Sequence, residues 1–252
     1  MRGLSLTVLI FLAASCGCAM GQLDANSKAD DVLNALRDSG RSIKSFSANV
    51  KVNDFDNGTG AETNRFGKVW FLIKPDGEPV MHIVFDQKQV GGKKMIPDKV
   101  EYLLDDGWLT LRTDATKTES RMQLVPQGQK VDLFQLGKSP FPMPIGQDPA
   151  EIQKQFDVSR QAPANDDPPG TIHLLLKPKP NSPMANRFSS VDIWTDTKTR
   201  MPVRIKTVDS KQVRETTADL TDLLVNPDLK NQDVTLPDLP PDWRTSETPL
   251  AQ

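Results

Sequence analysis

The sequence has very few of the side chains that carry common enzyme chemistry. Its 252 residues include two cysteines, two histidines and one tyrosine. Cys16 and Cys18 lie close together near the N-terminus, so neither a disulfide scaffold nor a cysteine metal site can form in the rest of the chain. His82 and His173 are isolated from each other and from any other ligand cluster, which favours structural histidines over zinc ligands.

Motifs of the common enzyme classes are also missing. The chain contains neither the G-x-S-x-G nucleophile turn nor a glycine-rich loop of the kind that cradles phosphate. Aspartate and glutamate are plentiful, but no spacing singles out one catalytic pair. We therefore expect a protein that is not an enzyme and that has no metal and no cofactor.

An excess of charge of either sign is absent as well. The chain has 31 basic and 33 acidic residues, and its formal net charge is −2. Nucleic-acid-binding proteins present a basic surface, so this balance predicts no nucleic-acid partner. Twenty prolines predict many loops.

The N-terminus has the pattern of an export signal over residues 1–21. Arg2 precedes an apolar run from Leu4 to Ala14, and small residues follow. Two cleavage sites stay open: a lipobox-like Ala13–Cys16, which would lipidate Cys16, and an ordinary site after Gly21. No later run approaches the ~18 apolar residues of a membrane span. We expect an exported bacterial protein, periplasmic or lipid-anchored in the envelope, for which peripheral membrane contact stays open.

After the leader, we expect one domain over residues 24–238 and a disordered polar tail over 239–252. Ala25, Ala29, Val32, Leu33 and Leu36 recur at helical spacing, which predicts an amphipathic helix that ends at Gly40. The pattern then changes to the two-residue alternation of β-strands, with a strand expected over 46–52, a loop over 53–58 and further strands to residue 225.

Two hairpins are the clearest strand signals. Asp105-Asp106-Gly107 separates strands expected at 100–104 and 108–112. The tetrad Asp196–Thr199 joins strands expected at 191–195 and 201–206. Trp194 stands on the otherwise polar face of its strand, and Trp70 and Leu72 do the same on theirs. A strand that is apolar on both faces suggests a sheet that curves around an enclosed interior.

The alternation stops from Val131 to Phe156. This segment is rich in apolar residues and broken by Pro140, Pro142 and Pro144, and Asp148-Pro149 predicts the start of a short helix. Loops are normally polar, so the segment is unusual. It is either a lid whose apolar side lies over a cavity or a cover that closes one end of a barrel.

Taken together, several stretches resemble the outer-membrane lipoprotein carrier family, LolA and LolB. They are the N-terminal helix, Phe46 in SFSANV, Gly67–Trp70, Lys74-Pro75, Asp106–Leu109 and the run from Val191 to Pro202. The resemblance implies a mainly β fold with some helix: an unclosed antiparallel β-barrel with an N-terminal amphipathic helix and a helical or loop lid. The chain departs from the family after Pro75 and in two apparent added loops, Gln87–Asp98 and Pro178–Asn186.

The resemblance further implies a protein that shelters acyl chains in a hydrophobic cavity and acts in lipoprotein transport or sorting. Its partners would be an acylated lipoprotein or lipid and a membrane transport complex. The candidate lining residues are Trp70, Leu72, Phe134, Phe141, Met143, Ile145 and Trp194, although such side chains more often only fill a core. Two alternatives stay open: a sensor of the same fold that binds a membrane protein, and a structural domain without ligand.

Overall fold

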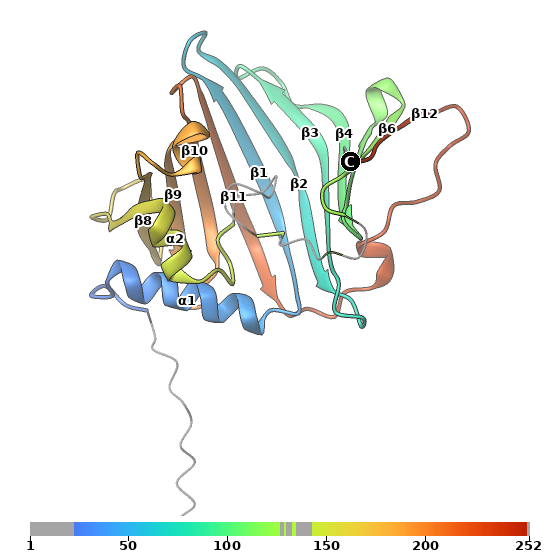
Figure 1. Cartoon of the computed structure of the whole chain (residues 1–252). Helices are drawn as coiled ribbons and strands as arrows, with labels where there is room; N and C mark the ends of the chain where they lie inside the picture. The colour runs from blue at the N-terminus through green and yellow to red at the C-terminus, as the bar shows by residue number, and fades with distance from the viewer. Residues whose placement is uncertain (1–22, 127–128, 130–132, 135–142, 251–252) are drawn as a thin grey trace, which may run out of the picture.

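The computed structural model describes residues 23–126, 129, 133–134 and 143–250. In this part of the chain, twelve strands form one sheet in the order β12-β6-β5-β4-β3-β2-β1-β11-β10-β9-β8-β7. Neighbouring strands are antiparallel except β12 and β6, which run parallel. The sheet curls around a hollow, and its edge strands β7 and β12 are not paired with each other (Figure 1). The expected unclosed, mainly antiparallel barrel is confirmed.

The elements in chain order are α1 (Ala29–Ser42), β1 (Ser45–Asp56), β2 (Ala61–Ile73), β3 (Pro79–Val90), β4 (Ile96–Asp105), β5 (Trp108–Thr113), η1 (Asp114–Thr116), β6 (Thr118–Gln123), α2 (Pro149–Gln155), β7 (Phe156–Arg160), β8 (Thr171–Pro178), η2 (Pro183–Asn186), β9 (Phe188–Asp196), β10 (Pro202–Asp209), β11 (Arg214–Val225), η3 (Asn231–Asp233) and β12 (Arg244–Thr248). Among the described residues, no helix is long and apolar enough to cross a membrane.

Helix α1 lies across one end of the sheet, as Figure 1 shows. Val32, Leu33 and Leu36 on its inner side are fully buried, and each contributes about 1.5–3 kcal/mol of burial free energy. The expected end at Gly40 is wrong, because the helix continues to Ser42. Gly40 instead permits a close contact: a Cβ added there would lie 2.2 Å from the backbone nitrogen of Gly146.

Local turn chemistry fixes the two predicted hairpins. Asp106 and Gly107 both have positive φ, 47° and 76°, which is the backbone of a type I′ turn between β4 and β5. In the turn between β9 and β10, one carboxylate oxygen of Asp196 accepts hydrogen bonds from the backbone N–H groups of Lys198 and Thr199. Both turns place the flanking strands side by side as antiparallel neighbours.

Three expectations for loops and the tail are wrong. Residues 53–56 continue β1, because they pair with both β2 and β11. Most of the apparent added loop Gln87–Asp98 belongs to β3 and β4, which continue to a tight turn at Gly91 and Gly92. In the tail expected to be disordered, Arg244–Thr248 forms β12 because its backbone pairs with the free edge of β6.

The two faces of the sheet have different neighbours. The concave face carries alternate residues such as Phe46, Val50, Val69 and Ile83, which are buried and belong to the hydrophobic core. The convex face carries the residues between them, among which Lys51 and similar polar side chains are exposed. This alternation places every second side chain of each strand in a different environment.

Candidate functional site

The candidate site is a cavity of about 460 Å³ on the concave face, named here the interior cavity. Its size is within the usual range for small-molecule sites, roughly 300–1,000 Å³. Most of its wall is apolar, from the strands β1–β4, β10 and β11: Val50, Val52, Val69, Met81, Ile83, Phe85, Tyr102, Ile205, Ala218 and Leu220.

Sheet register brings these wall residues together. Val52 on β1 lies opposite Ala218 on β11, and Ala218 lies opposite Ile205 on β10. On the other side of β1, Ile83 on β3 lies between Val69 and Tyr102 of its two neighbouring strands. Each row contributes one side chain per strand to the same face, so the curved sheet makes a continuous apolar wall.

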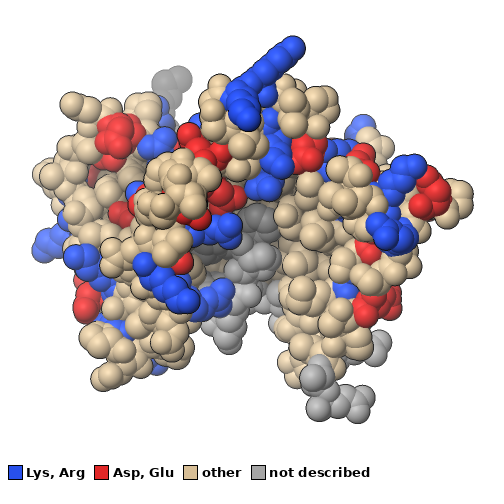
Figure 2. Space-filling view, turned by 90° about the horizontal axis from the view of Figure 1, so that it is seen from above, with Lys and Arg blue, Asp and Glu red and all other residues tan. Residues whose placement is uncertain are grey.

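The cavity becomes polar toward the end of the barrel that is opposite α1. Asp54 accepts a hydrogen bond at 2.8 Å from the hydroxyl of Thr216, and its other oxygen lies 3.2 Å from Nη1 of Arg65. Figure 2 looks onto this end and shows Lys and Arg side chains around the hollow. The cavity therefore has an apolar interior and a charged mouth.

Arg187 adds a second guanidinium to this mouth. It is exposed, lies just before β9 and has its guanidinium 5.6 Å from the ring of Phe188. No carboxylate of the described residues is within ion-pair distance of Arg187. Because Arg65 is neutralised by Asp54, Arg187 supplies the unbalanced positive charge of the cavity lining.

The segment broken by prolines, residues 131–156, contributes to the concave side of the sheet. Met143 lines the interior cavity. Phe134 packs on Phe46 and Phe71 of the concave face, with ring centroids 6.2 Å and 4.8 Å apart. Ile145 is buried beside α1, where the Gly146 N–H donates to the carbonyl of Leu36 at 3.1 Å. The described residues of the segment thus both pack against α1 and reach the cavity.

Of the predicted lining residues that the structure describes, Met143 is the one that lines the interior cavity, and Phe134 and Ile145 are not part of its lining. Trp70, Leu72 and Trp194 lie on the convex face, opposite to the placement we expected. The physical reason is that strand alternation separates two faces but does not determine which of them is concave, and the wall consists mainly of the medium-sized residues that alternate with the large aromatic ones. Phe141 and Cys16 are outside the described residues.

Trp194 is buried under the loop between β7 and β8. Its indole N–H donates to Asp167 at 2.5 Å, and its ring stacks on His173 at 4.1 Å. Burial raises the pKa of Asp167, but hydrogen bonds from the Ala164 N–H and the Trp194 indole outweigh it and hold this pKa below its usual value. The second face of this strand is therefore used for internal packing.

The second stacked pair, Trp70 and His82, is in contact with the C-terminal segment. The ring centroids lie 5.6 Å apart, and Nδ1 of His82 is 2.9 Å from the carbonyl oxygen of Asp233. The pKa of Glu101 is lowered mainly by the imidazole of His82, whose Nε2 lies 3.7 Å from Oε1 of Glu101. The ammonium of Lys99, 3.0 Å from Oε2, lowers it further, whereas burial of the carboxylate acts in the opposite direction. This buried polar cluster holds the segment after β11 on the convex face.

Neither histidine belongs to a metal-binding cluster in the described part of the chain. No group of three or more His, Cys, Asp or Glu side chains is arranged there to hold a metal ion. His173 has Asp192 as its partner, at 2.8 Å, and His82 has the groups named above. Each histidine is thus a packed side chain with one hydrogen-bond partner among the described residues, and the nearest carboxylate oxygen to Nε2 of His82 lies 3.7 Å away.

No protein-family model and no curated protein sequence matches this chain. Solved structures do match it, at low sequence identity. The MucA/MucB complex structure of Pseudomonas aeruginosa aligns with 83% of this chain at 17% identity and a TM-score of 0.48, and the chain spans only 61% of that protein. An uncharacterised conserved protein from Thermus thermophilus aligns over 87% of this chain and 99% of its own, at 10% identity and a TM-score of 0.50.

A LolA superfamily protein from Nitrosomonas europaea is another match, over 83% of this chain and 98% of its own, at 14% identity and a TM-score of 0.36. At such identities the likeness concerns the fold alone. The architecture of the described residues, an unclosed and mainly antiparallel barrel, is the one that the sequence resemblance led us to expect.

Proposed function

We propose that this protein, whose sequence resembles the LolA/LolB family, binds a single acyl chain of a lipid or lipoprotein in its interior cavity and acts in lipoprotein transport or sorting in the bacterial envelope. The observation that carries the proposal is the interior cavity itself, with apolar walls and a charged mouth. An acyl chain of about 16 carbons gains up to roughly 12 kcal/mol when it leaves water, at about 0.8 kcal/mol per methylene.

The cavity size favours one acyl chain over several. A volume of about 460 Å³ matches a site for one drug-sized ligand. A lipoprotein with three acyl chains would need a larger space, so one chain inside and the rest outside is the arrangement that fits. The guanidinium of Arg187 at the mouth favours a ligand whose polar end is negatively charged.

The test measures binding of a fluorescent fatty acid and of the alcohol with the same hydrocarbon chain. Both should bind to the purified protein without its leader, and the fatty acid should bind more tightly. Replacing Arg187→Gln should remove most of that preference, about tenfold for one charge-assisted hydrogen bond. Lys211→Gln is the matched control, because it removes one positive charge from the exposed turn between β10 and β11.

The outcomes separate the alternatives. If neither probe gains fluorescence, the proposal is wrong, and a stable protein partner in a pull-down would then distinguish a sensor from a structural domain. The mode of action needs a second measurement, namely the mass of the N-terminal peptide from the native host. An N-terminus at Gln22 supports a released carrier, whereas a diacylglyceryl adduct on Cys16 supports an anchored acceptor.

A further inference from the structure

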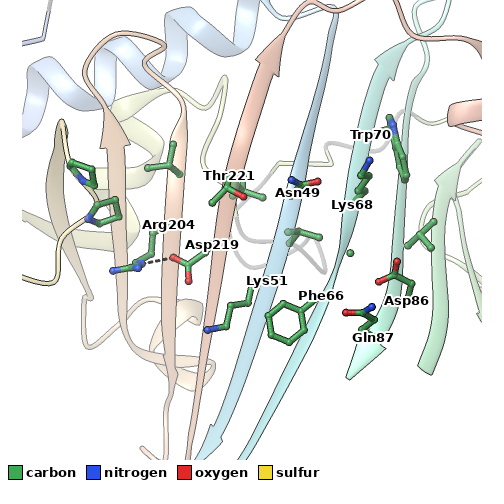
Figure 3. A pocket seen from close by; sticks show the side chains of 17 residues that line it. Asn49, Lys51, Phe66, Lys68, Trp70, Asp86, Gln87, Arg204, Asp219 and Thr221 are labelled. Atoms are coloured by element: carbon green, nitrogen blue, oxygen red, sulfur yellow. Dashed lines mark hydrogen bonds and ion pairs between the residues drawn. The ribbon is translucent and has the colours of Figure 1, made fainter. Parts of the chain in front are cut away.

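The convex face has a groove of its own, of about 750 Å³, named here the convex groove. Figure 3 shows its floor, which is formed by the strands β10, β11, β1, β2 and β3. Pro168 and Pro169, from the loop between β7 and β8, line it on the side of β10. This groove and the interior cavity are on opposite faces of the same strands, so the two sites have different openings.

Two lysines on the groove floor have no acidic partner. Lys51 on β1 and Lys68 on β2 are both exposed, and no ion pair or hydrogen bond of their ammonium groups occurs within the described ranges. The third cation, Arg204, is bound to Asp219, with Nε and Oδ1 2.5 Å apart. Among the lining residues, Asp86 is the remaining carboxylate. Apart from the bound pair, the floor thus carries two ammonium groups against one carboxylate.

Aromatic side chains flank these lysines. Phe66 and Trp70 are half-buried and lie on the same face of β2 as Lys68, two residues before and two residues after it. This spacing places them roughly 13 Å apart, at about 3.3 Å per residue. Lys51 lies opposite Phe66 in register, with its ammonium 5.9 Å from the ring centroid. Partly exposed aromatic residues beside cations are typical of protein-binding hot spots.

We propose that the convex groove binds an extended acidic segment of a partner protein. Its carboxylates would pair with Lys51 and Lys68, and two apolar side chains of the segment would pack, one on Phe66 and one on Trp70. The charge of the floor and the aromatic spacing match an extended chain of about four residues between the two rings. The proposal does not depend on the interior cavity or on the function proposed for it.

A membrane surface fits the groove less well than a peptide. The loop with Pro168 and Pro169 packs above the sheet, because the Asp166 carbonyl accepts from Arg204 and Asp167 binds Trp194. A flat bilayer would contact this loop before it reached the lysines on the floor. An extended segment can lie between the loop and Trp70, where its side chains reach the floor.

The experiment selects peptides from a random displayed library against the purified protein and measures the affinity of the enriched peptides by fluorescence anisotropy. We expect the enriched peptides to be rich in Asp and Glu and to contain aromatic or aliphatic residues. Raising the salt concentration from about 0.05 M to about 0.3 M should weaken their binding several-fold, because exposed ion pairs are screened. The double variant K51E/K68E should bind them at least about tenfold more weakly.

The matched control is K177E/K211E, which makes the same change in net charge at two exposed lysines outside the groove. It should bind the peptides as the unchanged protein does. Equal weakening in both double variants, or enriched peptides without acidic residues, would overturn the proposal. Vesicles of phosphatidylglycerol provide the last comparison: if K51E/K68E loses vesicle binding while no peptide is enriched, the groove binds a membrane surface and the proposal is wrong.

Discussion

The variant Ala218→Phe tests the interior cavity directly. Ala218 lies on β11 in the middle of the apolar wall, between Val52 and Ile205 of the neighbouring strands. A phenylalanine there would direct a ring into the space that we assign to the acyl chain. The ring replaces about six methylenes of ligand, at about 0.8 kcal/mol each, so the loss is about 5 kcal/mol and the dissociation constant rises more than a thousandfold.

Thr217→Phe is the control for this change. Thr217 precedes Ala218 on β11 and points to the convex face, where it lines neither the interior cavity nor the convex groove. Titration with a fluorescent fatty acid measures affinity, and thermal unfolding followed by circular dichroism shows that both variants are folded. If a folded Ala218→Phe variant bound the fatty acid as tightly as the unchanged protein, the interior cavity would not be the acyl site.

Three further predictions concern stability. The pKa of Glu101 is lower in the folded protein than in the unfolded chain, so its carboxylate stabilises the fold above the unfolded pKa of about 4.3. In urea unfolding, the unchanged protein should therefore be more stable than Glu101→Gln at pH 7, and this difference in stability should be lost as the pH falls below about 4.3. Gly40→Ala should lower stability by about 1–3 kcal/mol in thermal unfolding, although alanine favours helices, because its Cβ would clash with the backbone of Gly146; an unchanged midpoint would contradict this. Asp148→Ala should cost about 1 kcal/mol in the same assay, because the Asp148 side chain accepts from the Ala150 N–H at the start of α2, and Asp148→Asn should retain most of the stability.

The parts of the fold that were predictable depend on neighbours in sequence. The hairpin at Asp106-Gly107 and the cap at Asp148-Pro149 follow from backbone preferences of a few residues, and both are present. The pairing of β1 with β11 and of β6 with β12 joins distant segments, and turn chemistry gives no information about it. The sequence indicated a curved sheet, but it did not predict which distant strands pair with each other.

The lining of the cavity was harder to predict than the fold. Periodicity shows that residues such as Val69 and Trp70 are on opposite faces of a strand, but it does not say which face is concave. The placement expected for Trp194 was wrong because its partner, Asp167, lies in a loop with no pattern of its own. A better signal was the small residue Ala218 within an alternating strand, since a missing side-chain volume on the inner face leaves room for a ligand.

The two unpaired edge strands of the sheet have a mechanical consequence. A closed barrel has a fixed circumference, and its bore can change only when strands slide or backbone hydrogen bonds break. Here β7 and β12 are the terminal strands of an open ladder. The distance between them can increase through a small change of twist in each of the intervening strand pairs, with all of their hydrogen bonds retained. A change in the width of this opening therefore does not require a backbone hydrogen bond of the ladder to break.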